Sequence, residues 1–366
     1  MIYLFYIATC LLLIYIFNLL QFIKYFPLTT NKRLIGNIVP ISIIVAIKNA
    51  EDSTIDLIEC FKKQDYNGNI EFILVDDESN DNTANVIKNI SKEDKRFKYA
   101  SSINGDESLS FKKKALDVGI NKAKNEWLLF TDVDCRPGKT WVKEMAEYFV
   151  DENDYVVGVS TVIPSKTEVS KFQSLDFQLL IGAAVAQCNK GVPWACTGQN
   201  QAYRKSLFKK VHGFKHISNL LQGDDSVFMQ LCRYADANIV SALTEHSVIS
   251  RTENNLWSFL KQRMRWAGDS KYMINLCPTF FLVSLNTFLI NFFLLIFLLF
   301  NFAYFFPLFF LKSFFEYKLY SSLKDSSITT HDNSDNIFIW GFLQIPYIVL
   351  MGLTNFWSHK IFGWKK

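Results

Sequence analysis

Residues 126–134 read EWLLFTDVD, a short apolar run followed by two aspartates that stand one residue apart. The apolar run predicts a buried strand that ends in a loop. In extended backbone, residues i and i+2 point to the same side roughly 6.6 Å apart, so Asp132 and Asp134 can face one metal ion and a diphosphate bound to it. Aspartates after a strand can also simply cap the next helix. The rest of the sequence must decide between these two interpretations.

Strand and helix patterns alternate on both sides of this stretch. Apolar runs typical of strands occur at 41–47, 70–75, 97–100 and 127–131, and apolar residues at helical spacing occur at 52–64, 83–90 and 113–124. This alternation predicts an α/β fold in which helical crossovers join mostly parallel strands. Ligands bind such sheets beyond the carboxyl ends of the strands. The loops that follow the first, second and fourth of these strands should therefore converge on one crevice.

Two common nucleotide-binding motifs do not fit the chain. The run Pro137-Gly138-Lys139-Thr140 follows the aspartates, but a Walker A loop needs a glycine where Val133 stands. No Gly-x-Gly-x-x-Gly follows the first strand, which argues against a dinucleotide fold.

Hydrophobic residues make up 49% of the 366, with 34 phenylalanines, and they are concentrated in three segments. Residues 2–23 carry no charge over about 22 positions, which predicts an uncleaved transmembrane helix at 1–24. Residues 277–314 begin with an uncharged run too long for one span and short for two, so we expect one transmembrane helix or, preferably, a tight pair that turns near Asn301. Residues 337–357 form a third candidate, in which neighbouring helices can compensate for Pro346.

Basic residues beside these segments predict the side on which the polar part lies. Lys24, Lys32 and Arg33 follow the first span, and by the positive-inside rule they place residues 38–252 in the cytoplasm. The lysines of the 360–366 tail favour the same side and an even number of spans. We therefore expect a multi-pass protein of the inner or plasma membrane with a cytoplasmic catalytic domain.

Cysteine spacing and net charge agree with this location. The seven cysteines form no Cys-x-x-Cys pair, which is typical of a reducing compartment. A net charge of +4 without a dense basic stripe suits contact with anionic membrane lipids and argues against a nucleic-acid partner.

Residues 75–83, which read VDDESNDNT, form the second acidic segment. A turn with a helix cap accounts for Ser79 and Asp81. It accounts less well for Asp76 and Asp77, because adjacent carboxylates repel each other unless a donor or a cation offsets their charge. A nucleotide base or ribose would supply such donors.

Four motifs occur in order along the chain: Val75-Asp76-Asp77-x-Ser79-x-Asp81-x-Thr83, Asp132-x-Asp134, Gly223-Asp224-Asp225 and Gln262-x-x-Arg265-Trp266. From about Pro40 to Lys271, and into the terminal hydrophobic helices, the chain resembles the membrane-embedded family 2 glycosyltransferases that include cellulose, chitin and hyaluronan synthases. The resemblance implies a nucleotide-sugar-binding domain of GT-A type, flanked by transmembrane helices.

The resemblance also implies roles on the donor side. Asp76 and Asp77 would bind the base and ribose, with the choice between the two carboxylates left open. Asp132 would bind the sugar nucleotide, and together with Asp134 it would hold Mg²⁺ or Mn²⁺, for which carboxylate oxygens are suitable ligands. Lys112 matches a family lysine near the donor, although in a run of three lysines it can equally be a solvated side chain.

On the acceptor side, Asp225 matches the family's general base. The alternative is a cap for a helix at 227–234, to which Asp224 would be well suited. The family places residues 197–200 beside the acceptor, but by themselves they could form an ordinary turn.

Residues 253–276 are amphipathic, as in a helix that lies at a membrane surface. The resemblance adds a sharper role, with Gln262, Arg265 and Trp266 near the acceptor and the diphosphate. Arg265 could donate paired hydrogen bonds to phosphate, and Trp266 could stack on a sugar.

The expected activity is transfer, with inversion, of a sugar from a nucleotide diphosphate, preferably UDP, to a lipid or a growing glycan. The alternative is a membrane-anchored binding or scaffold protein that kept the fold and lost the activity. The sequence leaves open whether one sugar or many are added.

Overall fold

The computed structural model describes residues 1–26, 38–220, 222–244, 248–324, 326, 328–329 and 336–355, and it divides into two compact units. We call Thr29–Thr161 with Gly191–Arg251 the sheet unit. Met1–Leu28, Val162–Lys190 and Thr252–Lys366 form the helical unit. Lys32 and Arg33, the tail from residue 356 and the charge argument based on them lie outside the described residues.

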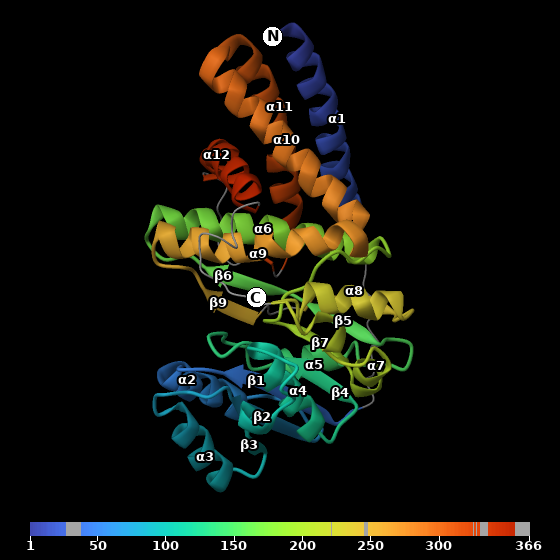
Figure 1. Ribbon diagram of the computed structural model, residues 1–366, viewed down its shortest axis with the longest axis vertical. Helices are drawn as coiled ribbons and strands as arrows, with labels where there is room; N and C mark the ends of the chain where they lie inside the picture. The colour runs from blue at the N-terminus through green and yellow to red at the C-terminus, as the bar shows by residue number, and fades with distance from the viewer. Residues whose placement is uncertain are drawn as a thin grey trace. The chain divides into compact units, whose positions relative to one another are not determined.

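A seven-stranded sheet forms the centre of the sheet unit (Figure 1). Its order is β3-β2-β1-β4-β7-β5-β8, with bounds β1 Ile41–Ile47, β2 Ile70–Asp76, β3 Phe97–Ser101, β4 Trp127–Phe130, β5 Tyr155–Gly158, β7 Gln201–Arg204 and β8 Ile239–Ala242. Only β7 runs antiparallel to its neighbours, β4 and β5, and the other pairings are parallel. The prediction of a mostly parallel α/β sheet is confirmed.

Helices of the sheet unit connect these strands. They are α2 Glu51–Lys62, α3 Thr83–Glu93, α4 Lys112–Lys122, α5 Trp141–Ala146, α7 Lys205–Lys210 and α8 Ser226–Tyr234. The core contains a row of stacked rings in which Phe72 lies 4.6 Å from Phe61 and 4.7 Å from Phe97, measured between ring centroids. On α4, Gly119 allows close packing against β1, since a Cβ there would lie 2.6 Å from the Cγ2 atom of Ile44. Two further strands, β6 Ser160–Ile163 and β9 Val248–Arg251, pair with each other.

The helical unit consists of long helices (Figure 1). They are α1 Ile2–Tyr25, α6 Glu168–Asn189, α9 Leu256–Leu276, α10 Pro278–Phe300, α11 Phe302–Leu323 and α12 Ile337–Asn355. Among the described residues, three helices are long and apolar enough to cross a membrane, namely Ile2–Tyr25, Pro278–Phe300 and Ile337–Thr354. The helix is interrupted between α10 and α11 at Asn301, whose backbone is extended with φ −158°. α11 continues past the expected end at 314 and carries the charged residues Lys312 and Glu316.

A buried polar cluster joins α1, α11 and α12. The Lys312 Nζ atom lies 2.6 Å from the Glu316 Oε1 atom and 2.6 Å from the Gln344 Oε1 atom. The Tyr15 hydroxyl donates to the same Glu316 oxygen at 2.7 Å. Because both charged side chains are almost completely buried, the cluster requires these three helices to pack in one register.

We expect Lys312→Met to destabilise the helical unit by about 3–5 kcal/mol, because it leaves the buried Glu316 carboxylate without its cation. Thermal unfolding in detergent measures this effect. Lys318→Met, at an exposed position of the same helix, is the control and should leave the transition within about 0.5 kcal/mol. Equal stability of the two variants would contradict a structural role for the pair.

Candidate functional site

The register of the parallel strands brings two acidic loops to one edge of the sheet. β2 and β4 both pair with β1, so their carboxyl ends point the same way. Asp76 pairs with Ile47, and Phe130 pairs with Ile44, two residues before Asp132. The two acidic segments therefore end at nearly the same level, separated by about 10 Å across β1.

The loop after β2 is fastened to the loop after β1. Backbone N–H groups that follow β1 donate to side-chain oxygens that follow β2. The pairs are Asn49 to Ser79 (3.0 Å), Ala50 to Thr83 (3.0 Å) and Glu51 to Asp81 (3.3 Å). The Asp81 carboxylate also accepts from the Thr83 N–H at 3.0 Å. These contacts agree with the turn expected for Ser79 and Asp81 and assign both side chains to loop structure, whereas the N-cap of α3 is Asn82.

Asp76 and Asp77 have different surroundings. Asp76 is buried, and its Oδ1 atom accepts from the backbone N–H of Ser79 at 3.3 Å. Asp77 is half-buried, accepts from the Ser102 hydroxyl at 2.8 Å and lies 3.9 Å from the Lys48 Nζ atom. The structure thus separates two carboxylates that the sequence treats alike. Asp76 supports the loop, whereas Asp77 is the more accessible of the pair.

Asp132, Asp134 and Cys135 follow β4 in a tight turn. One possible ligand atom from each residue lies within 4.8 Å of the others, and the Cys135 N–H donates to the Asp132 carbonyl at 3.1 Å. Partial desolvation raises the pKa of Asp134, and the nearby Asp132 charge adds to this rise. Asp132 is partly buried and Asp134 is exposed, so both carboxylates are accessible, and two closely spaced carboxylates fit a hard divalent cation such as Mg²⁺ or Mn²⁺. Cys135 is fully buried beside them.

Lys112, at the start of α4, joins two acidic segments that are distant in sequence. Its Nζ atom lies 2.6 Å from the Asp132 Oδ1 atom and 3.1 Å from the Asp224 Oδ2 atom. Burial lowers the pKa of Lys112, but the charges of Asp132, Asp224 and Asp225 outweigh this effect and raise the pKa well above its usual value. The lysine is therefore ammonium, and the carboxylates around it stabilise positive charge at this position.

The turn before α8 gives Asp224 and Asp225 separate roles. Gly223 has φ +104°, a value that favours glycine and sets the direction of the turn. Asp225 is the N-cap of α8, and its Oδ1 atom accepts from the Ser226 N–H at 2.5 Å. The sequence offered Asp224 as a suitable cap, but the cap is Asp225. The turn instead directs Asp224, which is buried, toward Lys112.

Residues 193–200 lie against the same cluster. The Cys196 N–H donates to the Ser226 hydroxyl oxygen at 3.1 Å, and the Ser226 hydroxyl donates to the Cys196 carbonyl at 2.9 Å. A Cβ at Gly198 would lie 3.1 Å from the Lys112 Nζ atom and 3.7 Å from the Asp224 Oδ2 atom. This packing supports a place for the segment at the site. From the sequence alone, the segment could equally have been an ordinary turn.

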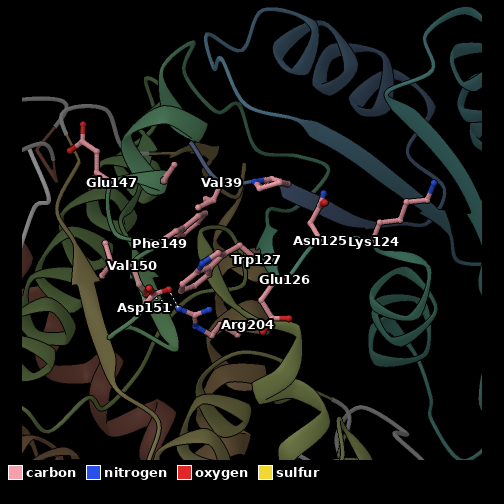
Figure 2. Close-up of a pocket in the computed structure, with 12 residues that line it drawn as sticks. Val39, Lys124, Asn125, Glu126, Trp127, Glu147, Phe149, Val150, Asp151 and Arg204 are labelled. Atoms are coloured by element: carbon pink, nitrogen blue, oxygen red, sulfur yellow. Dashed lines mark hydrogen bonds and ion pairs between the residues drawn. The ribbon is translucent and has the colours of Figure 1, made fainter. Parts of the chain in front are cut away.

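The cavity drawn in Figure 2 lies elsewhere in the sheet unit. Its volume is about 390 Å³, and Trp127, Phe149 and Arg204 line it near the residues where β1 and β4 begin. The guanidinium of Arg204 lies 4.8 Å from the Trp127 ring centre and donates to the carbonyls of Asn153 and Val150. These donors are occupied within the protein. We therefore assign the chemistry to the acidic cluster at the opposite edge of the sheet.

Comparison with a family of known proteins agrees with this geometry. Residues 42–212 match the family described as glycosyl transferase family 2. This part of the chain is similar to family 2 glycosyltransferases. The match includes Lys112, Asp132 and Asp134 but ends before Asp224 and Asp225. The contact of Lys112 with Asp224 therefore joins the matched region to a later segment.

Three known proteins are similar to this chain. An uncharacterized glycosyltransferase of Haemophilus influenzae is 28% identical over 123 residues, which make up 34% of this chain and 36% of the relative, so the chain spans about a third of that curated protein. The mannosyltransferase PcManGT of Pyrobaculum calidifontis, solved with GDP-Man and Mn²⁺, is similar with a TM-score of 0.59 and 14% identity, over 98% of this chain and 100% of that one. S. aureus TarS 1-349 has a TM-score of 0.45 and 16% identity, over 87% and 92%. The fold is of GT-A type.

Three predicted site residues lie outside the sheet unit. Gln262, Arg265 and Trp266 belong to α9 of the helical unit, and their substrate roles stay predictions. The Gln262 amide is engaged within the helical unit, since it accepts from Gln173 at 3.2 Å and donates to Glu253 at 3.4 Å. Arg265 and Trp266 are exposed.

Proposed function

We propose that the chain is a family 2 glycosyltransferase that transfers a sugar from a nucleotide-diphosphate sugar to an acceptor hydroxyl, with inversion at the anomeric carbon. The observation that supports this most strongly is the position of Lys112 between Asp132 and Asp224. Lys112 thereby links the loop of the expected metal-binding aspartates to the segment that contains the expected general base. The family match and the GT-A fold provide independent support.

On the donor side, Asp132 and Asp134 would hold Mg²⁺ or Mn²⁺. When bound, the metal would neutralise negative charge on the departing diphosphate. The Lys112 ammonium, which contacts Asp132, would add a second positive charge beside the phosphates. Of the pair after β2, we assign Asp77 to the base or ribose, because Asp76 is occupied by the loop. The two loops lie far enough apart for a nucleoside and its diphosphate to bind across β1.

On the acceptor side, Asp225 would accept the proton of the attacking hydroxyl. The acceptor oxygen forms the new bond to the anomeric carbon as the bond from that carbon to the diphosphate oxygen breaks. The electron pair leaves with the nucleoside diphosphate, and the proton moves to Asp225. Lys112 offsets the charge of the neighbouring Asp224, so that Asp225 works beside a neutralised carboxylate. Direct displacement of the diphosphate by the acceptor oxygen leads to inversion.

We further propose that the enzyme works at the cytoplasmic side of an inner or plasma membrane. The helices Ile2–Tyr25, Pro278–Phe300 and Ile337–Thr354 would anchor it, and residues 253–276 would lie at the surface. A lipid or glycan at the membrane would be the acceptor. UDP is the preferred nucleotide, although the similar mannosyltransferase binds GDP-Man, so both should be tested. The resemblance to polysaccharide synthases makes repeated addition of sugars to one glycan a possible activity. The length of the product would show whether one sugar or many are added.

Turnover of nucleotide sugars by the detergent-solubilised full chain tests the proposal. We expect Mn²⁺- or Mg²⁺-dependent release of nucleoside diphosphate from at least one UDP- or GDP-sugar, and a labelled product in native membranes. Removal of the metal with EDTA should stop both, and added metal should restore them. Tight donor binding without any turnover across the screen would favour a scaffold protein instead.

A further inference from the structure

Within the helical unit, one face of α6 holds the predicted acceptor-site motif of α9. Gln173, Asp176 and Phe177 are spaced i, i+3 and i+4, so they lie on the same side of α6. Gln173 donates to the side chain of Gln262 at 3.2 Å, and its own amide oxygen accepts the Glu253 N–H at 2.8 Å. The other two residues of this face are directed at the segment that contains Trp266.

Asp176 forms a buried ion pair with Arg263. The Asp176 Oδ2 atom lies 2.9 Å from the Arg263 Nη2 atom, and the side chains are only 6% and 3% exposed. None of the three guanidinium nitrogens has a hydrogen-bond partner among the described residues, so the contact with Asp176 is an ion pair without a hydrogen bond. Buried ion pairs without hydrogen bonds contribute little net stability compared with apolar side chains of similar size. Stability alone therefore does not account for the pair.

Two aromatic rings lie beside the Arg263 guanidinium. Its central carbon lies 4.2 Å from the Trp266 ring centre and 5.1 Å from the Phe259 ring centre. Phe177 of α6 contacts Trp266 with ring centroids 6.1 Å apart. Trp266 nevertheless remains 39% exposed. The indole thus packs on a buried cation on one side while part of its surface is open.

We propose that Asp176 is a positioning residue that fixes the indole of Trp266 by holding Arg263 beneath it. The sequence drew attention to Arg265, which is exposed, whereas the structure assigns the supporting role to its buried neighbour Arg263. A rigid, partly open indole is suited to stack on the apolar face of a sugar ring. The role of this surface in acceptor binding rests on the proposed function, but the positioning of the indole does not.

Fluorine NMR of the full chain labelled with 5-fluorotryptophan in detergent tests the positioning directly. Trp266→Phe identifies the Trp266 resonance. In Asp176→Asn, this resonance should shift or broaden, because the guanidinium loses its counter-charge. The matched control is Lys171→Gln, which removes an exposed ion pair with Glu168 on the same helix and should leave the resonance unchanged. An unchanged Trp266 resonance in Asp176→Asn would overturn the proposal.

A double variant separates positioning from folding. Asp176→Leu with Arg263→Met replaces the pair by apolar side chains and should keep the melting temperature near that of the wild type. We expect its Trp266 resonance to remain displaced, since no planar cation supports the indole. If the pair were only structural, this variant would restore both the melting temperature and the resonance, which would also overturn the proposal.

Sugar transfer in native membranes provides the functional measurement. With the indole displaced, transfer should fall about 10- to 100-fold, while binding of UDP and Mn²⁺ stays unchanged because those ligands occupy the sheet unit. A displaced resonance with normal transfer would support the positioning role of Asp176 and contradict a role of Trp266 in acceptor binding. Absence of transfer by the wild type would defeat the proposed function and leave the NMR result standing.

Discussion

Asp225→Asn should lower sugar transfer by about 10²- to 10⁴-fold, the usual contribution of a positioned general base. The substitution is informative because Asp225 also caps α8, and asparagine is an equally good N-cap. The helix should therefore stay in place while the proton acceptor is lost. Transfer measured in native membranes gives the rate, and titration with UDP and Mn²⁺ should give an unchanged affinity.

Asp236→Asn is the matched control for this experiment. Asp236 is an exposed aspartate with φ +60°, a conformation that asparagine tolerates. It should retain full activity. Wild-type turnover by Asp225→Asn would refute the assignment of the base, and Asp224 would then become the candidate despite its contact with Lys112.

Asp132→Asn and Asp134→Asn should weaken metal-dependent donor binding rather than the chemical step alone. Loss of even an outer partner of a metal ligand typically lowers metal affinity about 10- to 100-fold, so removal of a ligand should lower it at least as much. Asp132→Asn should have the larger effect, since it also removes the carboxylate that contacts the Lys112 ammonium. Isothermal titration with the nucleoside diphosphate, with and without Mn²⁺, measures both contributions.

The control for these two variants is Asp151→Asn. Its carboxylate is fully exposed and lies beside the cavity at the other edge of the sheet, so donor affinity should not change. Normal affinity in Asp132→Asn and Asp134→Asn would contradict metal ligation by these residues. In that case Lys112 would remain the main phosphate contact of the site.

Local patterns were sufficient to predict most elements of the sheet unit. The runs 41–47 and 127–131 appear as β1 and β4 with ends that differ by at most one residue, and the helical spacing at 113–124 appears as α4. Such patterns survive because the alternation of apolar residues is set by burial on a sheet or helix face. Strands β5, β7 and β8 of the sheet and the pair β6 and β9 were not predicted, because strands of four residues carry too little pattern to be recognised without their partners.

The candidate site could be predicted only in part. The sequence identified Asp132, Asp134 and Asp225 as chemically important, but it could not assign the cap between Asp224 and Asp225. That choice depends on the positive φ of Gly223 and on Lys112 reaching Asp224 from α4. In the sequence, Lys112 is equally compatible with a solvated lysine, and only its contacts with Asp132 and Asp224 place it in the site.

By itself, the sequence determined the α/β class of the sheet unit, the apolar helices and the acidic residues, because each depends on side-chain chemistry and on spacing within a few turns or strands. The tertiary structure decided which of these residues meet. Lys112 joins two distant acidic loops, Asp76 turns into its own loop, and Arg263 rather than Arg265 supports Trp266. Contacts of this kind depend on backbone turns and on packing between distant elements, and residue spacing along the chain does not encode them directly.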